Sequence, residues 1–347
     1  MKNYIKKHPA AVAILAVAVV ALFGLAYTQR QRVLSNPTEK SIADGPRASA
    51  PCENDFYYNQ LNEKEQEAYH TMLQHLKDKE GGVTELPSPL TGKEYMRVLS
   101  ALENSSGQYF YGLFEIPMTD EDFYVRYEER DLTRIIDPII AKVILFQSFS
   151  NGLDVPGEYD DQGRVSNLSE INTLLSQNDP EKLKKIEEKE AEIEACLTEI
   201  LSGLPEEAGE KEAVDYFLSW MDKNLELNTE IGVNAFQFNS MSEVLDQAYI
   251  YNNLSCVLEK KASISGFNKL LAELCRRSGI PAYVVQGVWG RQKTESYELC
   301  AVTLGETTYY VDASKAKGED FGNQRYLTGQ EAQNHMTFVE YFTYAPL

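Results

Sequence analysis

Uncharged and mostly apolar positions form one unbroken run near the start of the chain, over residues 10–27. A helix of that length would extend about 27 Å, which nearly matches a hydrocarbon core of about 30 Å. Basic residues flank the run, and those at the extreme N-terminus favour a cytoplasmic location for residues 1–9. We therefore predict a single-pass signal anchor in the cell membrane, with the remainder of the chain extracellular.

A cleavable signal peptide is the competing interpretation of this run. Gly24 and Ala26 satisfy the small-residue rule for a cleavage site. The run is longer than a usual signal-peptide core, which favours the uncleaved anchor. Residues 28–54 then mix Ser, Pro, Ala, Asn and charge without an apolar period, so we predict a disordered linker there.

Helical spacing of apolar residues predicts four helices beyond the linker. They cover residues 58–79, 92–103, 179–201 and 210–224. Asn62 followed by Glu65 is typical of a capping box at the start of the first helix. The third helix carries a run of Lys and Glu, which we interpret as a solvated face with helical ion pairs.

Residues 131–149 are strongly apolar and allow two interpretations. A second membrane span is opposed by Arg134, Asp137 and Lys142, because central charges in lipid cost several kcal/mol. We therefore predict a buried core helix. The preceding aromatic stretch, residues 109–127, is predicted to be extended.

The pattern of residues 253–314 predicts one helix followed by three strands. Apolar residues recur at helical spacing from Phe267 to Leu274, and Ser263 and Ser265 lie where an N-cap belongs. Val, Tyr and Thr are abundant in the three strands, over residues 282–289, 298–304 and 307–313. Two final edge strands are expected, in residues 325–327 and 338–344.

Charge and cysteine usage exclude several classes of function. The formal net charge of −20 argues against a nucleic-acid partner, because the phosphates would be repelled. Five cysteines at irregular spacing form neither a disulfide framework nor a zinc pattern, so we expect mostly buried free thiols. The four histidines contain no i,i+4 pair. We expect neither a metal site nor a cofactor, and we expect His335 at the surface.

Short motifs follow one another in a fixed order in the second half of the chain. They are Ala-Ser-Ile-Ser-Gly-Phe-Asn (residues 262–268), Leu then Gly-Ile-Pro (274 and 279–281), Val-Gln-Gly (285–287), residues 297–302 and Tyr-Tyr-Val-Asp-Ala-Ser (309–314). In this order they resemble the core of the bacterial transglutaminase-like family, which has a papain-like arrangement. The resemblance implies an α+β fold. A mainly helical N-terminal region (residues 55–205) would precede a transglutaminase-like domain (residues 206–347), in which a central helix packs against an antiparallel sheet.

The resemblance also implies that the catalytic machinery is incomplete. The family's nucleophilic Cys aligns with Ile264 and its catalytic His with Tyr297, whereas Asp312 retains the family's residue. Cys-His catalysis needs a thiolate and a neighbouring imidazole. Isoleucine has no nucleophilic atom, and a phenol with a pKa of about 10 is a poor base at neutral pH. We therefore expect neither transglutaminase nor peptidase activity.

Three hypotheses on function follow. In the first, the degenerate cleft binds a peptide or cell-envelope partner, with candidate binding residues Trp289, Tyr297, Asp312, Ser263 and Ser265. In the second, the chain is an active hydrolase or acyltransferase that uses a displaced nucleophile, either a serine of residues 263–265 or Cys300. In the third, it is a structural or assembly protein of the cell envelope, with the charged helix as its interaction face.

These candidate residues also have simpler structural explanations. Trp289 is expected to pack in the core, and Ser263 and Ser265 are sufficient as helix caps. Asp312 is acceptable as a strand-end residue with no chemical role. Peptides and cell-wall peptide stems are suggested as partners by family analogy alone.

Overall fold

The computed structural model describes residues 42, 44–48, 50–52, 55–79, 81–104, 113–119, 139–147, 179–228, 253–290, 295–322 and 324–344. The predicted signal anchor and the cytoplasmic segment before it lie outside these residues. Within the described part, no helix is both long enough and apolar enough to cross a membrane.

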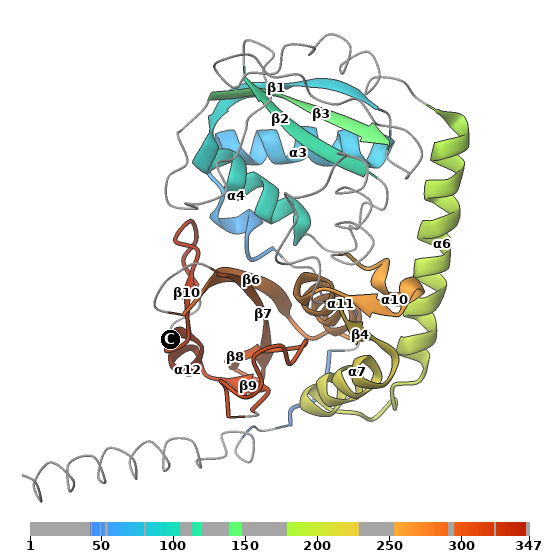
Figure 1. Cartoon of the computed structure of the whole chain (residues 1–347), viewed down its shortest axis with the longest axis vertical. Helices are drawn as coiled ribbons and strands as arrows, with labels where there is room; N and C mark the ends of the chain where they lie inside the picture. Colours follow the sequence, from blue (N-terminus) through green and yellow to red (C-terminus); the bar gives the residue numbers. More distant parts are fainter. Residues whose placement is uncertain are drawn as a thin grey trace, which may run out of the picture.

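The N-terminal part of the fold combines two helices with a small sheet. After a short 3-10 turn, η2 (Tyr58–Gln60), come α3 (Glu63–Asp78), β1 (Gly82–Thr91), α4 (Gly92–Glu103), β2 (Leu113–Thr119) and β3 (Ile139–Gln147). The sheet is antiparallel with the order β1-β3-β2, and α3 and α4 cover one of its faces (Figure 1). The predicted capping box is confirmed. The Asn62 side chain accepts from the Glu65 backbone N–H, and the Glu65 carboxylate accepts from the Asn62 backbone N–H. Thr91 and Glu94 cap α4 in the same way.

The prediction of a helix within residues 131–149 is wrong for the part that the structure describes. Residues 139–147 form β3, the central strand, which pairs with β1 on one side and β2 on the other. The β-branched residues that crowd this segment favour a strand, where they pack well on a pleated surface. Ile140 and Val143 are buried, whereas Lys142 is half-buried. The apolar run therefore reflects a strand in the middle of a sheet.

The C-terminal part places a curled antiparallel sheet against helices. Its elements are α6 (Pro180–Ser202), α7 (Glu210–Asn224), β4 (Glu226–Leu227), α10 (Cys256–Glu259), β5 (Lys261–Ala262), α11 (Ile264–Arg277), β6 (Ala282–Trp289), β7 (Glu295–Leu304), β8 (Thr307–Val311), β9 (Tyr326–Leu327), α12 (Gly329–Gln333) and β10 (Met336–Phe338). The sheet order is β10-β6-β7-β8-β9, so β9 and β10 are its edges, as expected. The last strand covers residues 336–338 and not the predicted 338–344.

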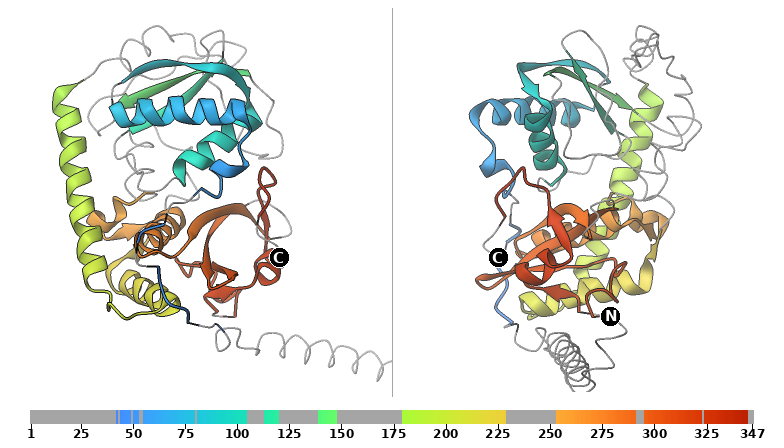
Figure 2. Two further views of the ribbon diagram at one scale, coloured as in Figure 1. Left: turned by 180° about the vertical axis from the view of Figure 1, so that it is seen from behind. Right: turned by 60° about the vertical axis from the view of Figure 1, so that its left-hand side comes forward.

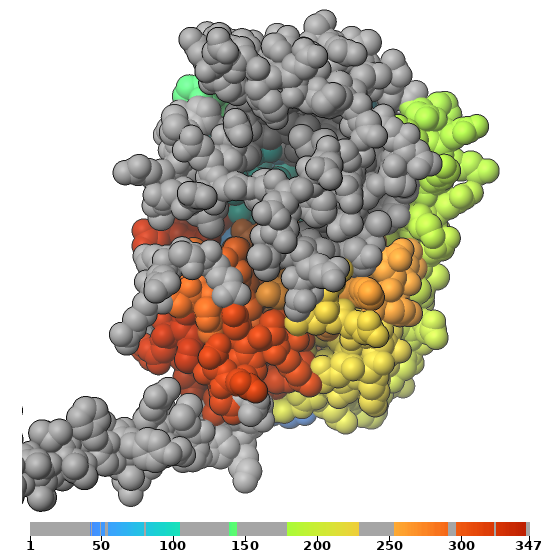
Figure 3. Space-filling view, viewed as in Figure 1, coloured from blue at the N-terminus to red at the C-terminus, as the bar shows by residue number. Residues whose placement is uncertain are grey.

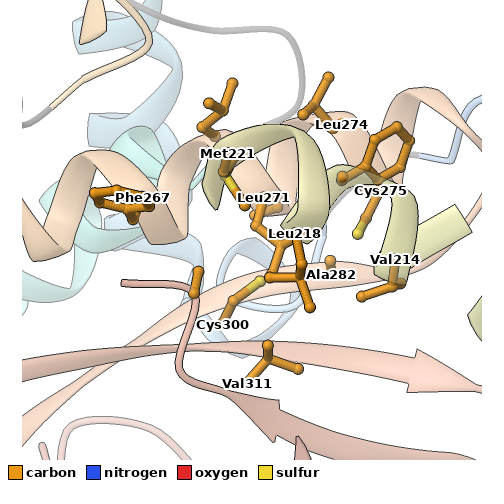
Figure 4. Packing of buried hydrophobic residues seen from close by; sticks show 14 of the residues in the cluster. Val214, Leu218, Met221, Phe267, Leu271, Leu274, Cys275, Ala282, Cys300 and Val311 are labelled. Carbon is orange, nitrogen blue, oxygen red and sulfur yellow. The ribbon is translucent and has the colours of Figure 1, made fainter. Parts of the chain in front are cut away.

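Two cores hold these parts together. In the first, α7 and α11 pack on the sheet, with Leu271 and Cys275 of α11 above Cys300 and Val311 (Figure 4). In the second, the opposite face of the sheet packs against aromatic residues that precede α3. Phe56, for example, stacks on Tyr283 with ring centroids 3.9 Å apart. The apolar packing is therefore continuous between the N-terminal and C-terminal parts, while α6 runs along one side of both (Figures 1 and 2).

A segment that we name the strap, residues 44–48 and 50–52, lies against the C-terminal part (Figure 2). Asp44 Oδ1 accepts from the Lys211 backbone at 2.9 Å, and the Arg47 Nε donates to the Ala208 carbonyl at 2.6 Å. The Cys52 backbone donates to the Arg276 carbonyl at 2.9 Å. We expected residues 28–54 to be a disordered linker, but these contacts make the described residues among them part of the fold.

The strap completes a helix that cannot cap itself. Gly209 is the N-cap of α7 and offers no side-chain acceptor, so Asp44 supplies one from a distant part of the chain. A Cβ added at Gly209 would lie 2.2 Å from Asp44 Oδ1, which leaves no room for another residue. In the space-filling view, α7 (yellow) lies between α6 (green) and the C-terminal residues (red) (Figure 3).

Candidate functional site

The start of α11 forms one side of the candidate site. Ser263 is the N-cap, and its Oγ accepts from the Gly266 backbone at 3.2 Å. Ile264 is the first helical residue and is half-buried against the second core. Asn268 Nδ2 donates to the Glu298 carbonyl at 3.0 Å, which fixes the first turn of α11 beside β7. The residue before Glu298 is Tyr297, so the two expected parts of the site lie on neighbouring elements.

Tyr297 lies on β7 and Asp312 directly follows β8, and each exposes only 1% of its surface. The pKa of Tyr297 is raised above its ordinary value, first by burial and then by the negative charge of Asp312. The buried Tyr297 Oη makes no hydrogen bond of ordinary geometry within the described residues. This phenol is therefore a still poorer base than an exposed one.

Asp312 is held by the loop that follows β8. The Ser314 hydroxyl donates to Asp312 Oδ1 at 2.9 Å, and the Lys317 backbone donates to Oδ2 at 3.3 Å. Ser314 Oγ also accepts from the Ala316 backbone at 3.2 Å. The carboxylate thus organises a tight loop, which is a sufficient structural role for it.

Trp289 covers Tyr297 from the end of β6. Its ring lies 5.0 Å from that of Tyr297 and 5.1 Å from that of Phe321. His335 stacks on it at 5.7 Å with an interplanar angle of 15°, and Lys317 Nζ lies 5.5 Å from the ring centroid. Aromatic and cationic groups therefore surround Trp289, which is half-buried against the second core.

His335 was not recognised from the sequence as part of this cluster. We expected it at the surface, but it is half-buried beside Trp289. The pairing of β10 with β6 places Met336 opposite Trp289, and the Gly290 backbone donates to the His335 carbonyl at 2.8 Å. Because this pairing joins distant segments, no local pattern could have indicated it.

The thiols and serines complete the inventory of possible nucleophiles. Cys256, Cys275 and Cys300 are buried free thiols, as expected, and burial raises the pKa of Cys256 to about 12. Burial also raises the pKa of Cys300, which packs in the first core among helix α11 and its sheet (Figure 4). Ser265 is half-buried. Burial raises the pKa of the nearby Glu298 carboxyl, and the Ser265 hydroxyl offsets part of that rise.

The arrangement therefore joins the start of α11 to a buried tyrosine–aspartate pair under an aromatic cover. Comparison with known proteins adds a structural likeness. No family model matches the chain, and no curated protein matches it either. One solved structure, described as the crystal structure of a TGase, aligns with a TM-score of 0.30 and 15% sequence identity. The alignment covers 54% of this chain and 44% of that chain, so this chain spans less than half the length of that protein.

Proposed function

We propose that this chain is a non-catalytic transglutaminase-like protein, held outside the cell membrane by its N-terminal segment, that binds a peptide or cell-envelope partner. One observation carries the proposal. At the positions that the family resemblance assigns to the catalytic His and Asp, Tyr297 lies buried beside Asp312. The phenol stays protonated at neutral pH, so it cannot take a proton from a nucleophile.

The third position of the alignment supports the same proposal. Ile264 begins α11, where the helix dipole would stabilise a thiolate. The alkyl side chain of Ile264 carries no charge that the helix dipole could stabilise. The buried thiols do not replace the missing nucleophile, because burial raises the pKa of Cys256 and of Cys300 and so disfavours their thiolates.

Binding, in contrast, is compatible with the groups that remain within reach of solvent. Trp289, Lys317 and His335 are each half-buried and lie side by side. They combine a large aromatic surface with a cation, in a chain whose formal net charge is −20. A partner with carboxylates, such as a peptide terminus or a cell-wall peptide stem, would meet an attractive group here and repulsion over much of the remaining surface.

A displaced serine nucleophile is the second candidate, and a single observation favours it. The Ser265 hydroxyl lies near enough to the Glu298 carboxyl to affect its pKa, so a carboxylate base is available there. Hydrolysis that disappears in Ser265→Ala, while Ser263→Ala only weakens the fold, would establish this alternative.

Tryptophan fluorescence gives a direct test of binding. The chain has two tryptophans, so Trp220→Phe leaves Trp289 as the only reporter. We expect soluble cell-wall stem peptides to change its emission saturably, and the same peptides with amidated carboxyl groups to bind less tightly. The Lys317→Met variant should weaken binding at unchanged thermal stability. A response that is equal for both peptide forms and unaffected by Lys317→Met would contradict the proposal.

A further inference from the structure

The Glu298 carboxyl group lies where β7 meets β6 and the start of α11. The residue lies on β7, and the Asn268 side chain of α11 donates to its backbone carbonyl. Gln286 of β6 donates to Glu298 Oε1 at 3.3 Å, a long bond. Oε2 exposes less than 1 Å² and has no hydrogen-bond partner within the described residues. A buried carboxylate oxygen in this situation loses its hydration without compensation.

Asn268 contains a second acceptor of the same kind. The residue is fully buried, and its Nδ2 donates to the carbonyls of Ile264 and Glu298 at 2.9 and 3.0 Å. These two bonds fix the orientation of the amide, so its oxygen cannot be exchanged for its nitrogen. The Oδ1 atom also exposes less than 1 Å² and has no partner in the described part of the chain.

Charged groups from two helices face this carboxyl. Lys269 of α11 lies 3.8 Å from Glu103 Oε2 at the end of α4, and this ion pair joins the two helices. Burial raises the pKa of Glu298, Lys269 and the Ser265 hydroxyl lower it in part, and Glu103 raises it further. Burial is the main cause that raises the pKa of the Tyr57 phenol, which precedes α3, and Glu298 adds a smaller increase. Lys269 therefore stabilises the negative charges of both Glu103 and Glu298.

We propose that Glu298 is a proton-operated latch at the joint between α4, α11 and β7. When the carboxyl is protonated, Oε2 carries its own hydrogen and the buried group is neutral. Lys269 then stays with Glu103 and holds α4 against α11. When the proton passes to solvent, a second negative charge competes for Lys269, and the link between α4 and α11 weakens.

The sign of the pH dependence follows from the direction of the shift. A carboxyl group whose pKa is raised in the fold binds its proton more tightly there than in the unfolded chain, where the value is about 4.3. The stabilising contribution is complete below that value and is lost as the pH rises through the folded pKa. The latch therefore closes at acid pH and opens as the pH rises through the folded pKa of Glu298. It concerns α4 and the start of α11, and it does not depend on the proposed partner.

Hydrogen exchange of the full-length protein in detergent tests the latch. After correction for intrinsic exchange rates, we expect protection in α4 and the first turns of α11 to fall as the pH is raised from about 4.3 through the folded pKa of Glu298. A tenfold loss corresponds to about one unit of pKa difference between the closed and open forms. Glu298→Gln mimics the protonated carboxyl and should stay protected throughout. The exposed Glu306 provides the matched control, because Glu306→Gln should behave as wild type.

A second variant keeps the test decisive if Glu298→Gln folds poorly. Glu103→Gln removes the competitor for Lys269 at an exposed helix end, so α4 should show low protection at every pH while α11 keeps its own. Parallel pH profiles in wild type and Glu298→Gln would overturn the proposal. So would a Glu103→Gln variant that retains the wild-type pH response in α4.

Discussion

At the scale of single residues, the capacity of the site for catalysis depends on which side chain lies beside Asp312. An imidazole there would share a proton with a thiolate at the start of α11, whereas the Tyr297 phenol keeps its own. The loop around Asp312 makes its hydrogen bonds through the Ser314 hydroxyl and the Lys317 backbone, and none of these depends on Tyr297. The scaffold should therefore tolerate a change at Tyr297.

A double substitution should restore the missing thiolate and imidazole. Ile264→Cys with Tyr297→His should create a thiol with a lowered pKa, because thiolate and imidazolium stabilise each other. The measurement is the rate of alkylation near neutral pH. Either single change should have a much smaller effect. Equal alkylation rates in the double variant and in Ile264→Cys alone would show that the three positions do not converge.

Wild-type protein serves as the reference for the same prediction. We expect no amine incorporation, deamidation or peptidase activity from it, and no rapid labelling of any thiol. Wild-type turnover that is abolished by Ser263→Ala, Ser265→Ala or Cys300→Ala would overturn the non-catalytic proposal.

At the scale of elements, α7 depends on a cap from outside its own segment. Asp44→Ala should lower the free energy of unfolding by about 1 kcal/mol, the usual effect of losing an N-cap acceptor. Asp44→Asn retains an acceptor oxygen and should cost much less. Thermal or urea unfolding of both variants would measure the difference, and identical values for the two would show that the strap does not cap α7.

Elements with short-range determinants could be predicted from sequence. The cap at Ser263, the apolar face of α11 and the Gly305 turn between β7 and β8 are each set by residues close to one another along the chain. The apolar run of β3 gives no periodicity that distinguishes a buried strand from a buried helix, so only its pairing on both sides decides it. The strap and His335 depend on contacts between distant segments, which no local pattern contains.

The site was predictable to the same extent. The order of motifs predicted Tyr297 and Asp312 on adjacent strands. Tyr297 lies on β7 and Asp312 directly follows β8, and burial and then the charge of Asp312 raise the pKa of Tyr297. The aromatic cover required β10 to pair with β6 and the loop after β8 to bring Lys317 over Trp289. The unpartnered oxygens of Asn268 and Glu298 follow from packing geometry, which sequence alone does not supply.

At the scale of the whole molecule, the charge and apolar pattern at the N-terminus predict its placement in the cell. Full-length protein should partition with membranes, and protease added outside intact cells should degrade the part that follows Arg32. Immunoblots against each end of the chain would report both results. A soluble product with a new N-terminus near Tyr27 would instead support a cleaved signal peptide.

The strap also determines how a mechanical load would travel through the protein. The Cys52 backbone is bonded to the Arg276 carbonyl at the C-terminal end of α11, whereas Ser263 and Ile264 stand at its other end. This helix has 14 residues, so it acts as a strut about 21 Å long between the tether and the candidate site. Tension applied at the N-terminus would therefore load α11 through this hydrogen bond, in addition to the backbone that continues from Cys52 towards α3.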